Sequence, residues 1–304
     1  MELAAAILEA TLRAATPLAL AALGELVIER SGTINIGLEG SVLAGAFAGA
    51  LVAQSLGAHA GLLGGAAGGV FFGVVFAVFA IGLRTDQVIA GTAVTLLAIG
   101  LTGSLARSLF GSEGLALTLP MLPATSLFGL DRMPIVGGVL FAQPYVLYVT
   151  LGLAIGFHVW MTRTHSGLSL RAVGESRQVA LSAGIDADRI RWIAILVGTA
   201  MAGMSGAVLV VAQAGTFVEG MSAGRGFIAI AIVALGRWRP LPVLAAALLF
   251  GGASALQFAA QAVGWSLPYQ ALLAAPYIVA LAVLVASARG GLPPAALGKH
   301  SHGE

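Results

Sequence analysis

Long apolar runs alternate with short polar or glycine- and proline-containing stretches over almost the whole chain. A helix needs about 20 apolar residues to cross a bilayer, and most of these runs reach that length. They predict an all-α integral membrane protein with about nine (roughly eight to ten) spanning helices, some of them broken or re-entrant. The predicted spans are residues 4–28, 40–57, 61–83, 87–109, 135–161, 192–212, 217–236, 241–263 and 268–288.

The composition excludes a water-soluble protein. Charged residues make up only 9% of the 304 residues and apolar residues make up 59%, whereas soluble domains carry about 25% charged residues. No stretch is long and polar enough to fold as a separate soluble unit. We therefore expect residues 1–304 to form a single transmembrane domain.

The sequence lacks the patterns that carry common enzymatic or metal chemistry. It has no cysteine and no GxxxxGKS/T, HExxH or GxSxG motif. Its five histidines are scattered near predicted span ends or in the C-terminal tail. We expect a protein that is not an enzyme and holds no metal ion.

Basic residues mark one side of the membrane. The stretch 162–191 between two predicted spans holds five arginines, and two further basic clusters follow at hairpin intervals. Positively charged loops face the cytoplasm, which places these clusters, Arg84 and the pair Glu29–Arg30 inside. The same count places residues 111–133 and the N-terminus outside, unless the first or second span is irregular.

The first polar break, residues 29–40, contains three charged residues, one asparagine and three glycines between two long apolar spans. Polar groups and irregular backbone persist at membrane depth only where protein or water satisfies them. If the segment is buried, Asn35 and Glu39 are candidates for lining a solute pathway, on one face of a short helix. A cytoplasmic turn followed by a helix start is the alternative.

Within the charged loop 162–191, residues 177–183 fit a short helix that Ser176 caps and Gly184 ends. Its small apolar stripe consists of Val179, Ala180 and Ala183. Such a short helix is marginal by itself and needs a docking surface, which a cytosolic partner would provide. An ordinary charged loop is the alternative.

A third segment, residues 219–239, also departs from a plain spanning helix. Its uncharged run 226–236 has 11 residues, which make only about 16 Å of helix, too short to cross alone. We therefore expect a broken helix, as solute pathways in transporters often contain. Glu219 and Arg225 are placed to pair at its outer end.

Glycines recur inside two of the predicted spans and predict close packing of helix backbones. They are Gly64, Gly65, Gly68, Gly69 and Gly73 in one span, and Gly198, Gly203 and Gly206 in the other.

At these segments the chain resembles the permease subunits of ATP-binding-cassette (ABC) importers. The similarity is to the branch for simple sugars and nucleosides, within the group that also serves ribose and branched-chain amino acids. It covers nearly the whole chain, and the block 29–40 is specific. The matching residues are Pro17–Leu18, Ala22–Glu25, Glu29–Gly32, Asn35–Gly40, Thr85–Ile89, Gly167–Leu168, Arg171–Glu175, Ala180, Gly184–Ile185, Gly224–Arg239 and Pro294–Lys299.

The resemblance implies a type II-like importer fold and two sets of functional residues. A coupling helix within residues 171–185 would dock on the ATPase, and the residues implied there are Arg171, Gly174, Glu175, Ala180, Gly184 and Ile185. The residues that would border the translocation pathway are Asn35, Glu39, Asp86 and Gln87.

The resemblance also implies a location and a set of partners. The chain would lie in a bacterial inner membrane, among lipid, and would bind neither nucleic acid nor a cofactor. Its partners would be a cytoplasmic ABC ATPase that uses the ATP, an extracytoplasmic solute-binding lipoprotein and a second permease. That second permease would be a paralogue or another copy of this chain.

Two rival functions remain open at this stage. A secondary transporter driven by protons or sodium would need carboxylates deep in the membrane. The candidates for that role are Glu25, Glu39, Asp86 and Glu219. An ABC permease for branched-chain amino acids would share the fold and the coupling loop.

Overall fold

The computed structural model describes residues 2–110, 118–126, 136–262 and 293–299, and four isolated positions between 274 and 285. The helices are α1 (Glu2–Arg30), α2 (Leu38–Leu56), α3 (Ala58–Ala77), α4 (Gln87–Phe110), α5 (Val136–Phe141), α6 (Tyr145–Arg163), α7 (His165–Glu175), α8 (Arg177–Ser182), α9 (Ala187–Val208), α10 (Arg225–Leu235) and α11 (Pro240–Ala262). The π-helical turns η1 (Val78–Gly82) and η3 (Leu209–Ala214) continue α3 and α9. The short strands β1 (Ala124–Ser126) and β2 (Ala142–Pro144) form one antiparallel pair.

Seven of the described helices are long and apolar enough to span a membrane, and α10 is an additional, shorter apolar helix. The all-α membrane class is thus confirmed in the described residues, apart from the small β1–β2 pair. The count of nine spans stays a prediction, because the predicted span 268–288 lies almost entirely outside the described residues. The predicted span 135–161 needs correction: its spanning helix begins at Tyr145, since Pro144 holds an extended conformation directly before it.

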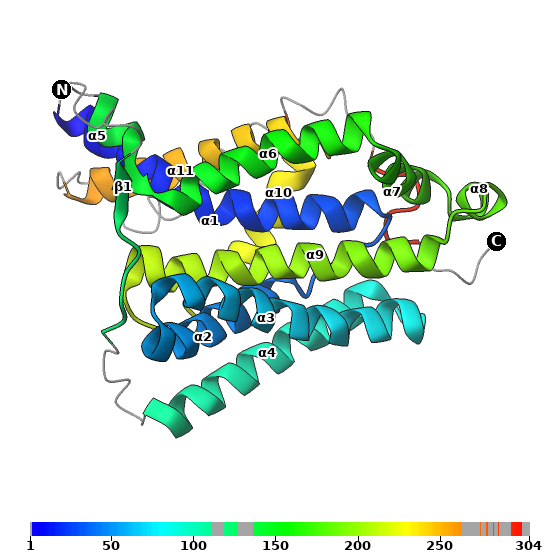
Figure 1. The fold of residues 1–304 in the computed structure, drawn as a ribbon, viewed down its shortest axis with the longest axis horizontal. Helices are drawn as coiled ribbons and strands as arrows, with labels where there is room; N and C mark the ends of the chain where they lie inside the picture. The colour runs from blue at the N-terminus through cyan, green and yellow to red at the C-terminus, as the bar shows by residue number, and fades with distance from the viewer. Residues whose placement is uncertain are drawn as a thin grey trace.

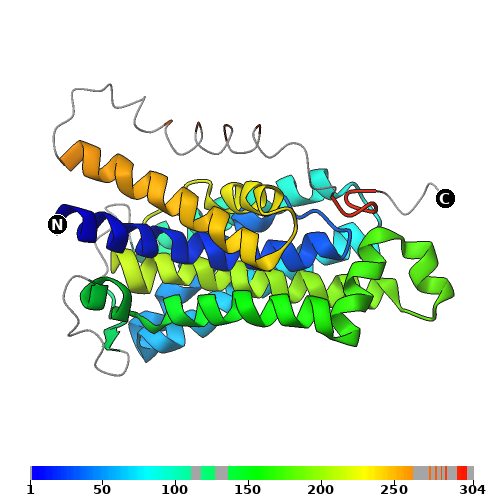
Figure 2. The ribbon, with the colours of Figure 1, turned by 90° about the horizontal axis from the view of Figure 1, so that it is seen from above.

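The helices α1 and α9 run side by side through the middle of the bundle, with α2 and α3 on one side and α6 and α11 on the other (Figures 1 and 2). Glycines allow this packing: a Cβ on Gly203 would overlap the Gly65 carbonyl oxygen, and one on Gly206 would overlap the Val42 carbonyl oxygen. The predicted close approach of helix backbones is therefore confirmed for these spans.

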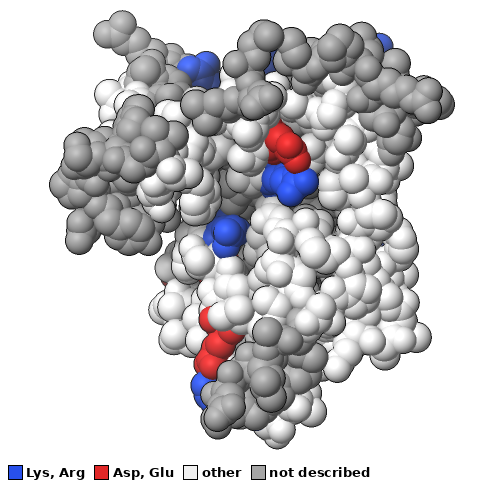
Figure 3. All heavy atoms as spheres, turned by 90° about the vertical axis from the view of Figure 1, so that its left-hand side faces the viewer, with Lys and Arg blue, Asp and Glu red and all other residues white. Residues whose placement is uncertain are grey.

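The two ends of the bundle differ in charge. The end that carries α7 and α8 in Figure 1 holds Arg30, Arg84, Arg163, Arg171, Arg177, Arg189, Arg191, Arg237, Arg239 and Lys299. The opposite end, viewed in Figure 3, shows few charged side chains among its described residues. By the positive-inside rule we expect the α7–α8 end to face the cytoplasm and the start of α1 to lie on the opposite side, a side that the sequence left open.

The segment 162–191 is not an ordinary loop but a pair of helices, α7 and α8, that projects beyond the bundle (Figure 1). The sequence analysis predicted α8 and missed α7. Thr164 caps α7 through its side chain, which accepts a hydrogen bond from the Gly167 amide. Leu170 and Val173 of α7 are buried three residues apart, the spacing of an amphipathic helix.

Candidate functional site

The short helix α8 has the ends that the sequence predicted. The Ser176 hydroxyl accepts a hydrogen bond from the Val179 amide at its N-terminus. At its C-terminus, the Gly184 amide donates to the Leu181 carbonyl and the Ile185 amide donates to the Ala180 carbonyl, a Schellman motif with Gly184 at φ +78°. Local sequence signals thus set both ends of this helix.

The apolar residues of α8 divide into an inner and an outer set, which corrects the predicted stripe. Ala180 is buried against Val173 of α7 and Ala187 of α9, so it joins the helical pair to the bundle. Val179 and Leu181 are instead 66% and 49% exposed. The surface available to a partner therefore includes Val179 and Leu181, while Ala180 has an internal role.

Replacing Gly184 with Val should weaken docking of the ATPase. A β-branched residue is strained at φ +78°, although the space around Gly184 is open. We expect at least about a fivefold loss of ATPase copurification with Val, and a smaller loss with Asn, which tolerates this conformation better. Both variants should reach the membrane in wild-type amounts. Equal ATPase recovery from the Val, Asn and wild-type proteins would count against a role for this cap in coupling.

The turn Glu29–Gly32 at the end of α1 is the point where several distant segments meet, and we call it the cytoplasmic junction. Gly174 of α7 packs so closely on it that a Cβ there would overlap the Arg30 carbonyl oxygen. Arg191 of α9 donates to the Ser31 carbonyl oxygen at 3.2 Å. From the C-terminal turn, the Ala296 amide donates to the Gly174 carbonyl oxygen at 2.9 Å.

The turn between α10 and α11 contacts the same junction through Trp238. The Trp238 indole donates to the Glu29 carboxylate, and Arg30 donates to the Trp238 carbonyl oxygen at 2.7 Å. Glu29 and Ser31 are almost completely buried. The junction therefore links α7 directly to α1, α9 and the α10–α11 turn.

Residues 31–37 form an irregular segment between α1 and α2 that other helices hold in place. The Gln87 side chain accepts from the Ile34 amide at 2.9 Å, and the Glu25 carboxylate accepts from the Asn35 amide at 3.1 Å. Thr95 of α4 donates to the Ile36 carbonyl oxygen at 3.2 Å. Side chains satisfy this backbone because little water reaches it, which favours the buried segment over a simple cytoplasmic turn.

Asn35 and Glu39 are both buried but do not share a helix face, because α2 begins only at Leu38. Neither Asn35 side-chain nitrogen nor oxygen has a hydrogen-bond partner in the described residues, whereas Glu39 is fully engaged. One Glu39 oxygen accepts from the Ser222 hydroxyl at 2.6 Å and the Gly224 amide at 2.8 Å. Its other oxygen accepts from the Gly226 amide at 2.7 Å.

The predicted break at residues 219–239 is confirmed, and Glu39 explains how it is stabilised. The helix α10 starts at Arg225, where its free amides and positive dipole end favour a carboxylate. Glu39 provides that carboxylate from α2.

Asp86 and Glu219 have structural partners. Asp86 caps α4, since one of its oxygens accepts from the Val88 and Ile89 amides at 2.8 and 3.0 Å. Glu219 forms an ion pair with Arg107 of α4 at 2.7 Å, so the expected pair with Arg225 is wrong. Arg225 instead donates to the carbonyl oxygens of Met221 and Ser222.

The structure brings the predicted coupling residues together, and Gly174 of this set contacts Gly32, near the segment that the predicted pathway residues surround. The coupling set lies on or beside α7 and α8, with Arg171, Glu175 and Gly184 exposed and Gly174 and Ala180 buried. The pathway set surrounds residues 31–37 and the start of α10. That Asn35, Glu39, Asp86 and Gln87 border a pathway stays a prediction.

Sequence patterns did not single out Arg191 and Trp238, which contact the cytoplasmic junction, or Ser222, which donates to Glu39. Arg191 and Trp238 carried a usable signal, because buried arginine and tryptophan side chains need hydrogen-bond acceptors. Their partners lie at least 160 residues away along the chain, which no local pattern reveals.

A helical bundle with an arginine-rich cytoplasmic end, a broken helix within the membrane and a projecting helical pair has the features of a transport permease. The family described as branched-chain amino acid transport system / permease component matches residues 7–288. The chain belongs to this family and is a multi-pass ABC transporter permease, as its resemblance implied.

Three named relatives each align with most of the chain. TsgC13 of Haloferax volcanii, named as a candidate glucose ABC transporter permease, is 36% identical over 90% of this chain and 83% of its own length. NupQ of Bacillus subtilis, a guanosine ABC transporter permease, is 33% identical over 91% and 90%. NupC of Lactococcus lactis, a nucleoside ABC transporter permease, is 30% identical over 88% of each.

The fold also matches a solved structure. A candidate metal-chelate-type ABC transporter in an inward-facing conformation aligns with a TM-score of 0.53, over 93% of this chain and 86% of that chain. At 15% identity this similarity supports the fold alone.

Proposed function

We propose that this chain is the translocation subunit of an ABC importer that passes a nucleoside or simple sugar across a bacterial inner membrane. The relatives named for glucose, guanosine and nucleosides support the solute class. The observation that carries the proposal is the projecting pair α7–α8, with exposed Val179 and Leu181 at the arginine-rich end. This surface fits a cytoplasmic ATPase.

The cytoplasmic junction suggests how motion would pass from the ATPase to the membrane. ATP binding would draw two ATPase subunits together and move α7–α8. Gly174 contacts Arg30 directly, so α1 would move with α7, and Arg191 and Trp238 would involve α9 and α10. This chain would perform no covalent chemistry and bind no cofactor, because the ATPase uses the ATP.

The proposed assembly contains three further kinds of protein. A second permease, a paralogue or another copy of this chain, would complete the pathway. The cytoplasmic ATPase would bind the α7–α8 end, and an extracytoplasmic lipoprotein would deliver the solute to the opposite end. Lipid would cover the outer helices, and no nucleic acid takes part.

The rival secondary transporter has little support from the described carboxylates. Glu39, Asp86 and Glu219 are each held by fixed hydrogen bonds or an ion pair. Only Glu25, of the four candidates, keeps one buried oxygen without a partner in the described residues. A carrier that moves protons or sodium needs carboxylates that can exchange such partners.

Uptake in cells separates these functions. We expect labelled guanosine or glucose to enter cells that express the complete transporter, and uptake to continue after ionophores collapse the proton and sodium gradients while ATP is maintained. A parallel strain without the transporter sets the background. Loss of uptake with the gradients would establish a secondary transporter, and uptake of leucine alone would identify an amino acid permease.

A further inference from the structure

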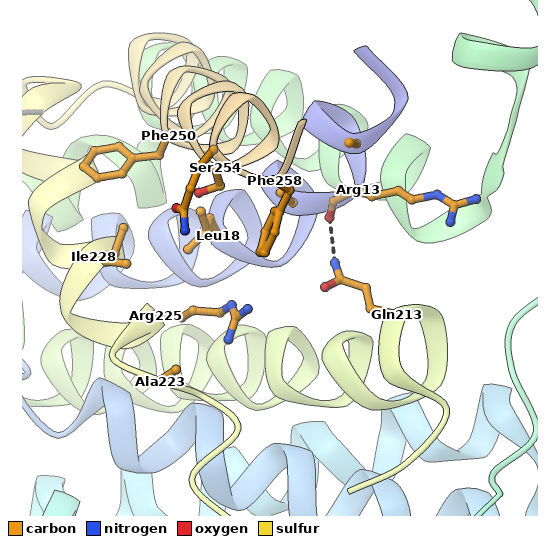
Figure 4. Close-up of a pocket in the computed structure, with 12 residues that line it drawn as sticks. Arg13, Leu18, Gln213, Ala223, Arg225, Ile228, Phe250, Ser254 and Phe258 are labelled. Carbon is orange, nitrogen blue, oxygen red and sulfur yellow. Dashed lines mark hydrogen bonds between the residues drawn. The ribbon is translucent and has the colours of Figure 1, made fainter. Parts of the chain in front are cut away.

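A cavity of about 560 Å³ lies between α1, α10, α11 and η3. Small-molecule sites typically have volumes of about 300–1,000 Å³. The first half of α1 and the second half of α11 form its walls, so it lies in the extracytoplasmic half of the bundle, and the start of α10 forms its inner end (Figure 4).

One side of the cavity is polar. Gln257 of α11 lines the cavity and is only 8% exposed. Its carboxamide is a hydrogen-bond donor and acceptor at the cavity wall, where a ligand or water can bind it. Ser254, one helical turn away, adds a hydroxyl to the same wall.

The inner end of the cavity holds a fixed cation. Arg225 begins α10, and its guanidinium donates to the carbonyl oxygens of Met221 and Ser222. Glu39 binds the amides of Gly224 and Gly226 on either side of Arg225. Glu39 therefore positions Arg225 at the inner end of the cavity without lining the cavity itself.

The remaining walls are mainly apolar and include two aromatic rings, Phe250 and Phe258. Gln213 also lines the cavity, and its amide donates to the Arg13 carbonyl oxygen. Phe258 is 63% exposed and extends into the space in Figure 4, where the Arg13 side chain points away from it. No carboxylate is among the described residues that line the cavity. Such a wall suits a neutral ring with polar edges better than an amino acid, whose ammonium group needs an acceptor.

We propose that this cavity is a solute subsite that binds a nucleoside on its way through the membrane. Gln257 and Arg225 hydrogen-bond the polar edges of the solute, and Phe258 packs against the face of its base. This assignment rests on the proposed function and narrows its solute class from nucleosides and sugars to nucleosides.

Because the natural chain has no cysteine, a single introduced thiol can report occupancy of the cavity. In the reconstituted transporter we expect guanosine to slow labelling of Ser254→Cys by a water-soluble maleimide at least about fivefold. The matched control is Ser55→Cys at the exposed extracytoplasmic end of α2, whose labelling guanosine should not change. Equal labelling of Ser254→Cys with and without guanosine would overturn the proposal. So would a thiol that reacts in the isolated chain but not in the complex, because a partner permease would then fill the cavity.

Transport kinetics test the polar wall itself. At matched amounts of protein in the membrane, we expect Gln257→Leu to raise the KM for guanosine uptake about tenfold, since the solute loses a hydrogen-bonding amide. Phe258→Ala should also raise the KM for guanosine uptake. Because Phe258 is an exposed side chain, its loss should leave the fold intact. Gln54→Leu, at an exposed position near the end of α2, is the matched control. KM values within twofold of wild type in both cavity variants would overturn the subsite.

Transport by the wild-type protein distinguishes a failure of the proposed function from a failure of the subsite alone. If it transports neither guanosine nor glucose, the proposed function itself fails. If it transports guanosine but the cavity variants and the labelling show no effect, only the subsite fails. If it transports glucose alone, and Gln257→Leu changes that uptake, the nucleoside assignment is overturned.

Discussion

We expect Glu39→Gln to reduce solute uptake at least about tenfold, because a carboxamide cannot accept all the hydrogen bonds that the buried carboxylate accepts. Glu39 accepts three hydrogen bonds, from the Ser222 hydroxyl and the amides of Gly224 and Gly226. A carboxamide offers one oxygen, and its NH₂ group would face a backbone N–H. Each buried donor left without an acceptor costs about 1–3 kcal/mol, so the start of α10 should lose its defined position.

Uptake by proteoliposomes with matched amounts of inserted protein measures this effect. The control is Glu9→Gln, which makes the same chemical change at a partly exposed residue paired with Arg13. The control should transport like wild type. Wild-type transport by Glu39→Gln from acidic to alkaline pH would show that neither the charge nor the second oxygen is needed.

Replacing Gly174 with Ala is expected to uncouple ATP hydrolysis from transport. The added Cβ would overlap the Arg30 carbonyl oxygen and lie 3.3 Å from the Gly32 amide, both backbone atoms with little room to move. Overpacking of this kind costs about 1–3 kcal/mol. We expect α7 to shift away from the cytoplasmic junction and uptake to fall at least about tenfold.

The measurement compares solute uptake with the ATPase rate of the same complex. Gly156→Ala on α6 is the matched control, because its new Cβ would meet no atom within 4 Å. We expect Gly174→Ala to retain the bound ATPase and ATP hydrolysis but to lose uptake. Normal uptake per ATP hydrolysed in this variant would show that the cytoplasmic junction does not couple ATP hydrolysis to transport.

The features that the sequence predicted correctly are those that depend on local physics. Ser176 and Gly184 mark the ends of α8, because capping and a left-handed C-terminal residue involve only nearby backbone. The break before α10 follows from an apolar run too short to cross. For residues 31–37 the sequence left a buried segment and a cytoplasmic turn open, and the structure favours the buried segment.

The features that it missed depend on contacts between distant segments. Glu219 has two arginines within reach, and only the packing of α4 beside the residues before α10 selects Arg107 over Arg225. Asn35 and Glu39 are spaced for one helix face, yet α2 starts between them because hydrogen bonds with α1 and α4 hold residues 34–36 in a non-helical conformation. The charged sequence of α7 resembled a loop because its buried face is narrow and packs on the bundle.

The central claim is that this chain works as one part of an ATP-driven importer through its α7–α8 end. The most direct test is to purify the tagged chain from its native membranes in mild detergent and to identify the proteins that accompany it by mass spectrometry. We expect an ABC ATPase and a second permease in stoichiometric amounts, with the ATPase reduced in the Gly184→Val preparation. Recovery of the chain alone, under conditions that keep another ABC transporter of the same cells intact, would contradict a role in such an importer.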